Sequence, residues 1–253
     1  MTDKNKNTLN NDFSANNDFS LVEVFLQAKS TVLYLREFYT EIYVDNFPDP
    51  DERESLDNLL TYLKNAETAD NYRYHIVLLK DNTNNSIIGG SIFNYFMEPN
   101  SGVIEFIAVK NNIQSRGVGT LIYDYIVKTM SADAQKLRQK KLDYIFCEID
   151  SPEHSKTKIK KYLYFWRKLN YRRLDFNYVQ PSLSALQEPV TGLWFIVSQQ
   201  INCCKEIQGK VVIKVLSDYM RYAMQIDNPE ENSIFQKMRQ EILSKGLRLL
   251  PIV

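Results

Sequence analysis

The chain has 253 residues, and its 31 basic and 31 acidic side chains leave a formal net charge of zero. This balance argues against nucleic acid or an anionic membrane as the main partner, and no apolar run approaches the ~18 residues that a membrane helix needs. The three cysteines, two of them adjacent, do not form a disulfide framework, and two histidines argue against a histidine-rich metal site. The N-terminus also lacks the apolar core of a signal peptide. A cytoplasmic protein without a metal is therefore expected.

The polarity of the chain changes after its first 18 residues. Residues 1–18 are mostly Asn, Asp, Lys, Ser and Thr, which predicts a disordered tail. The next segment has apolar residues at helical or strand spacing. We expect a strand at 21–25, helices at 32–44 and 51–65, and strands at 74–79 and 87–96. Gly89 and Gly90 inside the last of these strands predict a bulge or a close approach of the backbone.

Residues 102–130 read as a strand, a glycine loop and a helix. Residues 103–109 are apolar and rich in β-branched side chains, as in a buried strand. The first N–H groups of the following helix have no partner within the helix, and the helix dipole adds partial positive charge there. Gly117 and Gly119 leave room for a phosphate, and Arg116 adds a positive charge. The pattern fits a diphosphate site or a simple strand-to-helix turn.

The spacing of the glycines narrows the choice of ligand. A dinucleotide loop would need a small residue at Ile122, and a Walker loop would need Gly-Lys-Ser/Thr; both are absent. The loop resembles motif A of the GNAT superfamily of N-acetyltransferases, Gln/Arg-x-x-Gly-x-Gly/Ala, through Gln114, Gly117 and Gly119. The resemblance extends over roughly 19–199 and implies acetyl-coenzyme A as the acyl donor. It implies the following binding residues: Ile107, Ala108, Val109, Gln114, Ser115, Arg116, Gly117, Val118, Gly119 and Thr120.

The remainder of this region completes the predicted fold. We expect a helix at 132–141, a strand at 142–149, a helix at 155–169, and strands at 173–180 and 192–197. Residues 163–171 resemble the later GNAT motif F-Y-x-x-L-G-F, but Trp166 replaces its tyrosine and Asn170 its glycine. The order predicts an α+β fold, in which helices flank a central mixed, mostly antiparallel sheet.

Residues 200–253 extend beyond the region of resemblance. Amphipathic helices are expected at 211–226 and 233–243, followed by an apolar tail at 247–253. We expect this extension to pack on the domain; a homodimer surface or a lid over the substrate is the alternative.

Acetyl transfer to an amine needs a group that removes a proton from the amine, and a donor that stabilises the oxyanion. The resemblance points to the backbone of Ile107 for the oxyanion. Glu105 and Glu148 interrupt apolar strands, and burial would raise their pKa toward the range of a general base. The period of two places Glu105 on the face of Ile107. A buried salt bridge or a solvent-facing position is the structural alternative for either glutamate.

The proton donor and the acceptor are less sharply defined. Tyr162, Tyr164 and Tyr178 could replace the family's tyrosine as the acid, and Tyr178 shares a strand face with Gln180 near the expected acceptor pocket. The acceptor is expected to be a small-molecule or protein amine. Acidic residues at the start of the helix at 51–65 could attract a cationic acceptor or simply be solvated: Asp51, Glu52, Glu54 and Asp57. A non-catalytic acyl-coenzyme A-binding module that regulates a protein interaction is the alternative function.

Overall fold

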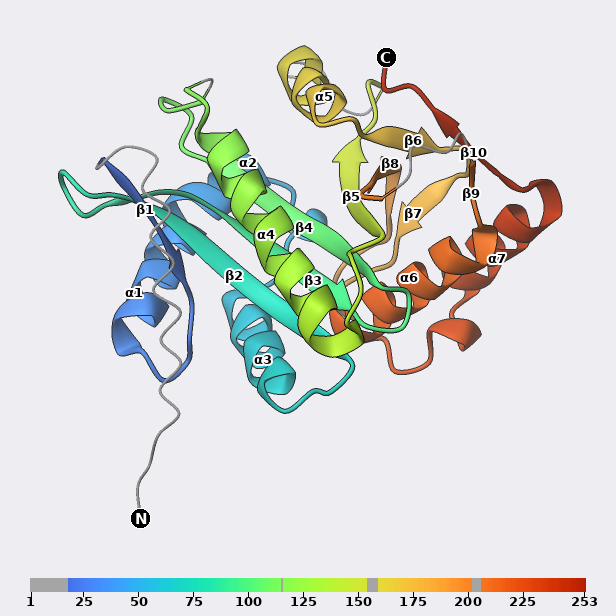
Figure 1. Cartoon of the computed structure of the whole chain (residues 1–253), viewed down its shortest axis with the longest axis horizontal. Coiled ribbons are helices and arrows are strands. Elements are labelled where there is room, and N and C mark those ends of the chain that lie inside the picture. The colour runs from blue at the N-terminus through green and yellow to red at the C-terminus, as the bar shows by residue number, and fades with distance from the viewer. Residues whose placement is uncertain (1–17, 115, 154–158, 202–205) are drawn as a thin grey trace.

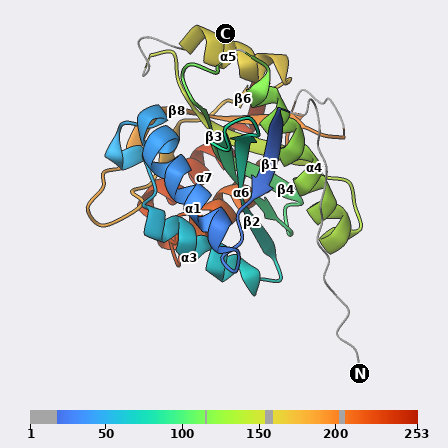
Figure 2. The same cartoon turned by 90° about the vertical axis from the view of Figure 1, so that its left-hand side faces the viewer.

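The structure is a computed structural model that describes residues 18–114, 116–153, 159–201 and 206–253. The predicted disorder of residues 1–17 and the predicted role of Ser115 therefore fall outside the described residues. The described strands form one ten-stranded sheet in the order β1-β2-β3-β4-β5-β8-β6-β10-β9, and β7 also pairs with β8. Helices cover both faces of this sheet (Figures 1 and 2).

The first four strands form an antiparallel meander. They are β1 (Phe19–Glu23), β2 (Tyr72–Asp81), β3 (Ile87–Phe96) and β4 (Ser101–Val109). The connection between β1 and β2 contains the α-helices α1 (Lys29–Phe38), α2 (Val44–Asn46) and α3 (Leu56–Glu67), the π-helix η1 (Tyr39–Tyr43) and the 3₁₀ helix η2 (Pro50–Glu52). The helix expected at 51–65 begins only at Leu56, because Ser55 caps it by accepting a hydrogen bond from the Asn58 amide. Residues 53–55 are therefore not helical.

The sheet forks between β4 and β5 (Tyr144–Asp150). These strands are parallel and pair from Ser101 opposite Tyr144 to Ile104 opposite Cys147, where their pairing ends. Each strand places a glutamate immediately after the last pair: Glu105 on β4 and Glu148 on β5.

Helices α4 (Val118–Arg138) and α5 (Ile159–Lys168) pack on one face of the sheet. Helices α1 and α3 pack on the other face, which Figure 2 shows opposite α4. The helical structure expected at 132–141 is confirmed as far as Arg138, but it continues α4, which ends where Gln139 adopts a left-handed conformation. The predicted α+β class, with helices flanking a mostly antiparallel sheet, is confirmed.

The last third of the chain extends the same sheet. Its elements are β6 (Arg172–Leu174), β7 (Tyr178–Gln180), β8 (Val190–Gln199), β9 (Glu206–Ile207), α6 (Gly209–Tyr222), η3 (Pro229–Glu231), α7 (Ser233–Lys245) and β10 (Leu247–Leu250). The single strand expected at 173–180 is two short strands. The tail expected to be merely apolar forms β10, which pairs with β6 and β9. Helices α6 and α7 share a core with α1 and α3.

Candidate active site

The glycine loop leaves the N-terminus of α4 open. Gly117 caps the helix with φ 82°, a left-handed conformation that favours glycine. A Cβ atom added at Gly117 would meet no atom within 4 Å, and one at Gly119 would meet only the Phe165 ring, at 3.5 Å. Arg116 is exposed beside the loop. The described part of the loop therefore has the room, the helix N-terminus and the positive charge that a diphosphate needs.

The end of β4 lies next to this loop. The side-chain amide of Gln114 donates to the Val109 carbonyl across 3.4 Å and so connects the loop to the strand. Val118 is buried under the first turn of α4, where the amide of Thr120 donates to the Gly117 carbonyl across 3.0 Å. The described residues expected to bind the cofactor are thus brought together from β4 and α4.

The hydrogen-bond pattern of β4 fixes the direction of its backbone groups. The Lys110 amide donates to the Ile88 carbonyl across 2.9 Å, so hydrogen-bonded pairs with β3 recur at every second residue of β4 in this register. Ile107 and Val109 fall between those pairs, and their N–H and C=O groups point away from β3. They point to the side of β4 where the fork with β5 opens, which suits the Ile107 N–H as an oxyanion donor.

Glu105 lies at a bulge in β4. Ile92 pairs with Phe106 and Phe93 pairs with Ile104, so Glu105 has no partner residue in β3. The expectation that Glu105 shares a face with Ile107 is wrong, because the bulge turns Glu105 and Phe106 toward the α1 and α3 face.

The Glu105 carboxyl is almost completely enclosed. Its side chain is 7% exposed and accepts a hydrogen bond from Asn94. Burial raises the pKa of Glu105 well above its usual value, and the charges of Glu54 and Glu148 raise it further, against the hydrogen bond from Asn94. Glu105 therefore belongs to a group of interacting carboxyls rather than to a salt bridge within the described residues.

Glu148 is more accessible than Glu105. Its carboxyl accepts a hydrogen bond at Oε1 from the Tyr219 hydroxyl, whereas Oε2 has no hydrogen bond within the described part of the chain. Burial raises its pKa to about 7, while Tyr219 and Tyr178 act to lower it and Glu52 to raise it. A carboxyl with one oxygen that has no hydrogen bond and with this pKa can take up a proton near neutral pH.

Of the three tyrosines considered as acids, only Tyr178 adjoins a candidate base. It is buried against Phe195, with ring centroids 5.0 Å apart, and burial followed by the charge of Glu148 raises its pKa well above the usual value. Tyr164 is 58% exposed on α5. Tyr162 packs at right angles on Trp166 in the core on the α4 side, which explains Trp166 as a packing residue.

Near this fork, Tyr219 was not predicted as part of the site, and Glu54 was predicted only as one of four acidic residues that could attract a cationic acceptor or be solvated. Tyr219 comes from α6, where its position on the buried stripe of the helix, seven residues after Val212, was the available signal. Glu54 lies before the cap of α3, is 2% exposed, and accepts hydrogen bonds from Asn58 across 2.7 Å and from Tyr62 across 2.9 Å. Burial raises the pKa of Glu54 to about 7. Nothing in the local sequence distinguishes it from its solvated neighbours.

Two further properties concern cofactors and membranes. Within the described ranges, no three or more His, Cys, Asp or Glu side chains are grouped so that they could hold a metal ion. None of the helices in these ranges is long and apolar enough to cross a membrane.

Comparisons with known proteins agree with this geometry. No curated protein matches the chain in sequence. One similar solved structure is that of a Bacteroides thetaiotaomicron protein, which is described as a putative acetyltransferase from the GNAT family. It aligns with a TM-score of 0.57 and 14% identity, over 82% of this chain and 99% of that chain. A phosphinothricin acetyltransferase from Sinorhizobium meliloti, solved in complex with AcCoA, aligns with a TM-score of 0.48 and 13% identity, over 72% and 88% of the two chains.

At this level of identity, the first alignment shows a shared fold. The family model described as the acetyltransferase (GNAT) family matches residues 34–155, which include the end of β4, the glycine loop and both glutamates of the fork. Residues 34–155 therefore match the acetyltransferase (GNAT) family, and the chain has the fold of a solved structure described as a member of that family.

Proposed function

We propose that the protein transfers an acetyl group from acetyl-coenzyme A to a primary amine, with Glu148 as the general base. The observation that carries the proposal is the Oε2 atom of Glu148, which is buried and has no hydrogen bond within the described residues, on a carboxyl with a pKa of about 7 where the sheet forks. A lysine-like amine has a reference pKa of about 10.4 and is almost entirely protonated at neutral pH, so a base at this position has a clear use.

The glycine loop and the end of β4 would hold the acyl donor, which supplies an activated acetyl thioester. Gly117 and Gly119 leave the N-terminus of α4 open to the diphosphate, and Arg116 would face its negative charge. The Ile107 N–H, which points away from β3, would stabilise negative charge on the acetyl oxygen.

The remaining side chains would handle the protons. The acceptor nitrogen forms a bond to the acetyl carbon, the carbon–sulfur bond breaks, and coenzyme A leaves as a thiolate. Glu148 would take the proton from the nitrogen, directly or through water. Tyr178, whose high pKa keeps its hydroxyl protonated, is the candidate donor of a proton to the thiolate.

The test compares Glu148→Gln, Glu105→Gln and the exposed control Glu188→Gln in an assay of thiol release from acetyl-coenzyme A. Glu148→Gln should lower kcat by roughly 10²–10⁴-fold, as expected for loss of a general base. Calorimetry should show unchanged acetyl-coenzyme A binding, since the loop is untouched.

Two other results have definite meanings. A large loss in Glu105→Gln alone would move the base to β4. Wild-type activity in both variants, with any amine that is turned over, would contradict a carboxylate base. Cofactor binding without turnover of any amine would favour the non-catalytic acyl-coenzyme A-binding module.

A further inference from the structure

Three carboxyls converge on one side of the forked sheet. Glu54 precedes α3, Glu105 sits at the bulge of β4, and Glu148 lies on β5. Glu105 interacts electrostatically with both of the others, because the charges of Glu54 and Glu148 raise its pKa. The region around these three side chains is called the acidic fork below.

The acidic fork has no basic partner within the described part of the chain. In the ranges that the structure describes, the side chains that donate hydrogen bonds to its three glutamates are tyrosines and asparagines, and no ion pair joins these glutamates to a lysine, arginine or histidine. Buried charges are normally paired, since removing a charge from water costs several kcal/mol.

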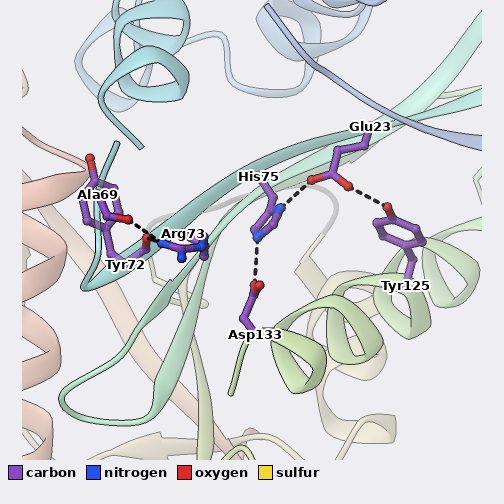
Figure 3. A network of polar contacts seen from close by, with 7 residues as sticks. All are labelled: Glu23, Ala69, Tyr72, Arg73, His75, Tyr125 and Asp133. Carbon is purple, nitrogen blue, oxygen red and sulfur yellow. Dashed lines mark hydrogen bonds and ion pairs between the residues drawn. The ribbon is translucent and has the colours of Figure 1, made fainter. Parts of the chain in front are cut away.

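The same protein pairs its buried acids elsewhere. On the far side of β2, His75 lies 2.5 Å from Glu23 and 2.9 Å from Asp133, and Tyr125 donates to Glu23 across 3.0 Å (Figure 3). The histidine supplies there the positive charge that the acidic fork lacks. The raised pKa values of the acidic fork favour protonation of its carboxyls in the free protein, and a bound cation would instead favour their charged form.

An unpartnered hydroxyl points to the same place. Tyr74 of β2 is 5% exposed, and its hydroxyl has no hydrogen bond within the described residues. Its ring packs at 5.6 Å from that of Tyr62, which donates to Glu54, and the charges of Glu105 and Glu54 raise its pKa after burial, so the hydroxyl lies near both carboxyls. A buried hydroxyl without a partner is unfavourable unless a ligand supplies one.

We infer that the acceptor is an aliphatic diamine or polyamine, whose reacting amine lies at Glu148 and whose second, protonated amine is held between Glu54 and Glu105. This inference rests on the proposed function. The second ammonium would donate to the carboxyls and to the Tyr74 oxygen, and would neutralise buried charge.

The surroundings suit the rest of such a molecule. The Phe106 ring packs against Tyr43 and Phe47, with centroids 4.8 and 4.9 Å away, and the Tyr43 hydroxyl donates to the Glu54 amide across 3.0 Å. Aromatic rings next to the carboxyls can contact a methylene chain and face an ammonium. A carboxylate on the acceptor would add negative charge to the acidic fork and should be rejected.

The experiment compares acceptors that differ at one end only. Thiol release from acetyl-coenzyme A is measured with α,ω-diaminoalkanes of three to eight carbons, with n-alkylamines of the same length, and with the matching ω-amino acids. For the best chain length, kcat/KM should be about tenfold or more higher for the diamine than for the alkylamine, the factor expected for one added charge interaction of about 1.4 kcal/mol. The amino acid should be slowest.

Variants connect this preference to the acidic fork. Glu54→Gln keeps the shape of the side chain but removes its charge, and should lower the ratio of diamine to alkylamine kcat/KM by about tenfold. Glu67→Gln removes an exposed charge at the C-terminal end of α3 and should leave the ratio unchanged. Circular dichroism checks the fold of each variant, and Glu105→Gln provides the same test if Glu54→Gln does not fold.

The outcomes separate this inference from the proposed function. Equal use of alkylamines and diamines, or turnover of other amines but of no diamine, would overturn the inference and leave the acetyltransferase standing. A ratio unchanged in folded Glu54→Gln and Glu105→Gln would also overturn it. Absence of thiol release with every amine would instead remove the proposed function.

Discussion

Glu105 and Glu148 interrupt their strands in the same way but meet different surroundings. Glu105 is enclosed at a bulge and accepts a hydrogen bond from Asn94, whereas Glu148 has one carboxyl oxygen without a hydrogen bond within the described residues. A general base works best when its pKa lies near the working pH, and burial raises the pKa of Glu148 to about 7. The two glutamates therefore suit different tasks: a base at β5, and at β4 an enclosed carboxyl whose raised pKa favours its protonated form.

The pKa of Glu148 predicts a pH dependence. Below about 7 the carboxyl is increasingly protonated in the free enzyme and cannot accept a proton, so kcat/KM should fall more steeply with decreasing pH there than above 7. Tyr219→Phe removes a hydrogen bond that lowers this pKa, so the change of slope should move to higher pH. A pH profile unchanged by Tyr219→Phe would show that another group controls this slope.

His75 predicts a stability effect. His75→Gln leaves Glu23 and Asp133 without their positive partner, and should lower the free energy of unfolding by about 3 kcal/mol near pH 6. The two carboxyls hold the pKa of His75 at about 10, above its usual 6.5, although burial acts to lower it. This stabilisation is complete below about 6.5 and is lost as the pH rises toward 10.

Glu23 sets the acid limit of the same network. Its pKa is lowered from 4.5, because the hydrogen bond and charge of His75 outweigh burial. That contribution is present above 4.5 and is lost as the pH falls through the lowered pKa. Denaturant titrations across pH should therefore show the largest difference between wild type and variant at about pH 5–6, and a constant difference from pH 5 to 10 would contradict this account.

At the scale of elements, sequence patterns predicted that the strands exist more reliably than they predicted where each strand begins, ends or is interrupted. The break between β6 and β7 could not be predicted, because it depends on contacts with the extension. Asp175 forms an ion pair with Arg248 of β10 at 2.9 Å, and the Asn177 amide donates to Glu241 of α7 across 3.1 Å. Both partners are more than 60 residues away in sequence.

The paired glycines of β3 allow a direct test of packing. A Cβ atom at Gly90 would come within 2.7 Å of the Val77 carbonyl oxygen and 2.9 Å of the Phe38 ring. Gly90→Ala should therefore destabilise the fold by roughly 1–3 kcal/mol, as overpacking does. Gly119→Ala is the matched control, because its Cβ would make only an ordinary contact with Phe165 at 3.5 Å. Thermal unfolding should therefore give a lower midpoint temperature for Gly90→Ala than for Gly119→Ala.

At the scale of the whole molecule, the extension is part of the core and of the candidate site. Strand β10 lies in the sheet beside β6, and Tyr219 of α6 contacts Glu148. A chain that ends at residue 199 would lose these contacts and expose the core that α6 and α7 cover. We predict that it does not unfold cooperatively, as judged by circular dichroism; a cooperative transition with retained acetyl transfer would contradict this role.

Only the part of the candidate site that is formed by residues close together in the sequence could be predicted from the sequence. The glycine loop and the strand before it are contiguous, so their spacing was sufficient to predict the resemblance to the GNAT family that the match over 34–155 supports. The acidic fork could be predicted only in part, because Glu54, Tyr74 and Tyr219 meet there from segments that are far apart in the chain. The bulge at Glu105 also reverses the face that a regular alternation predicts.

The most direct test of the account is calorimetric titration of the wild-type protein and of Gly119→Trp with acetyl-coenzyme A. The wild type should bind, and the folded variant should bind at least tenfold more weakly, because the indole would occupy the open N-terminus of α4; a tenfold loss corresponds to about 1.4 kcal/mol. Gly119→Ala serves as the control. Equal affinity of the wild type and a folded Gly119→Trp variant would show that the diphosphate binds elsewhere, and absence of binding to the wild type at millimolar cofactor would contradict the proposed function itself.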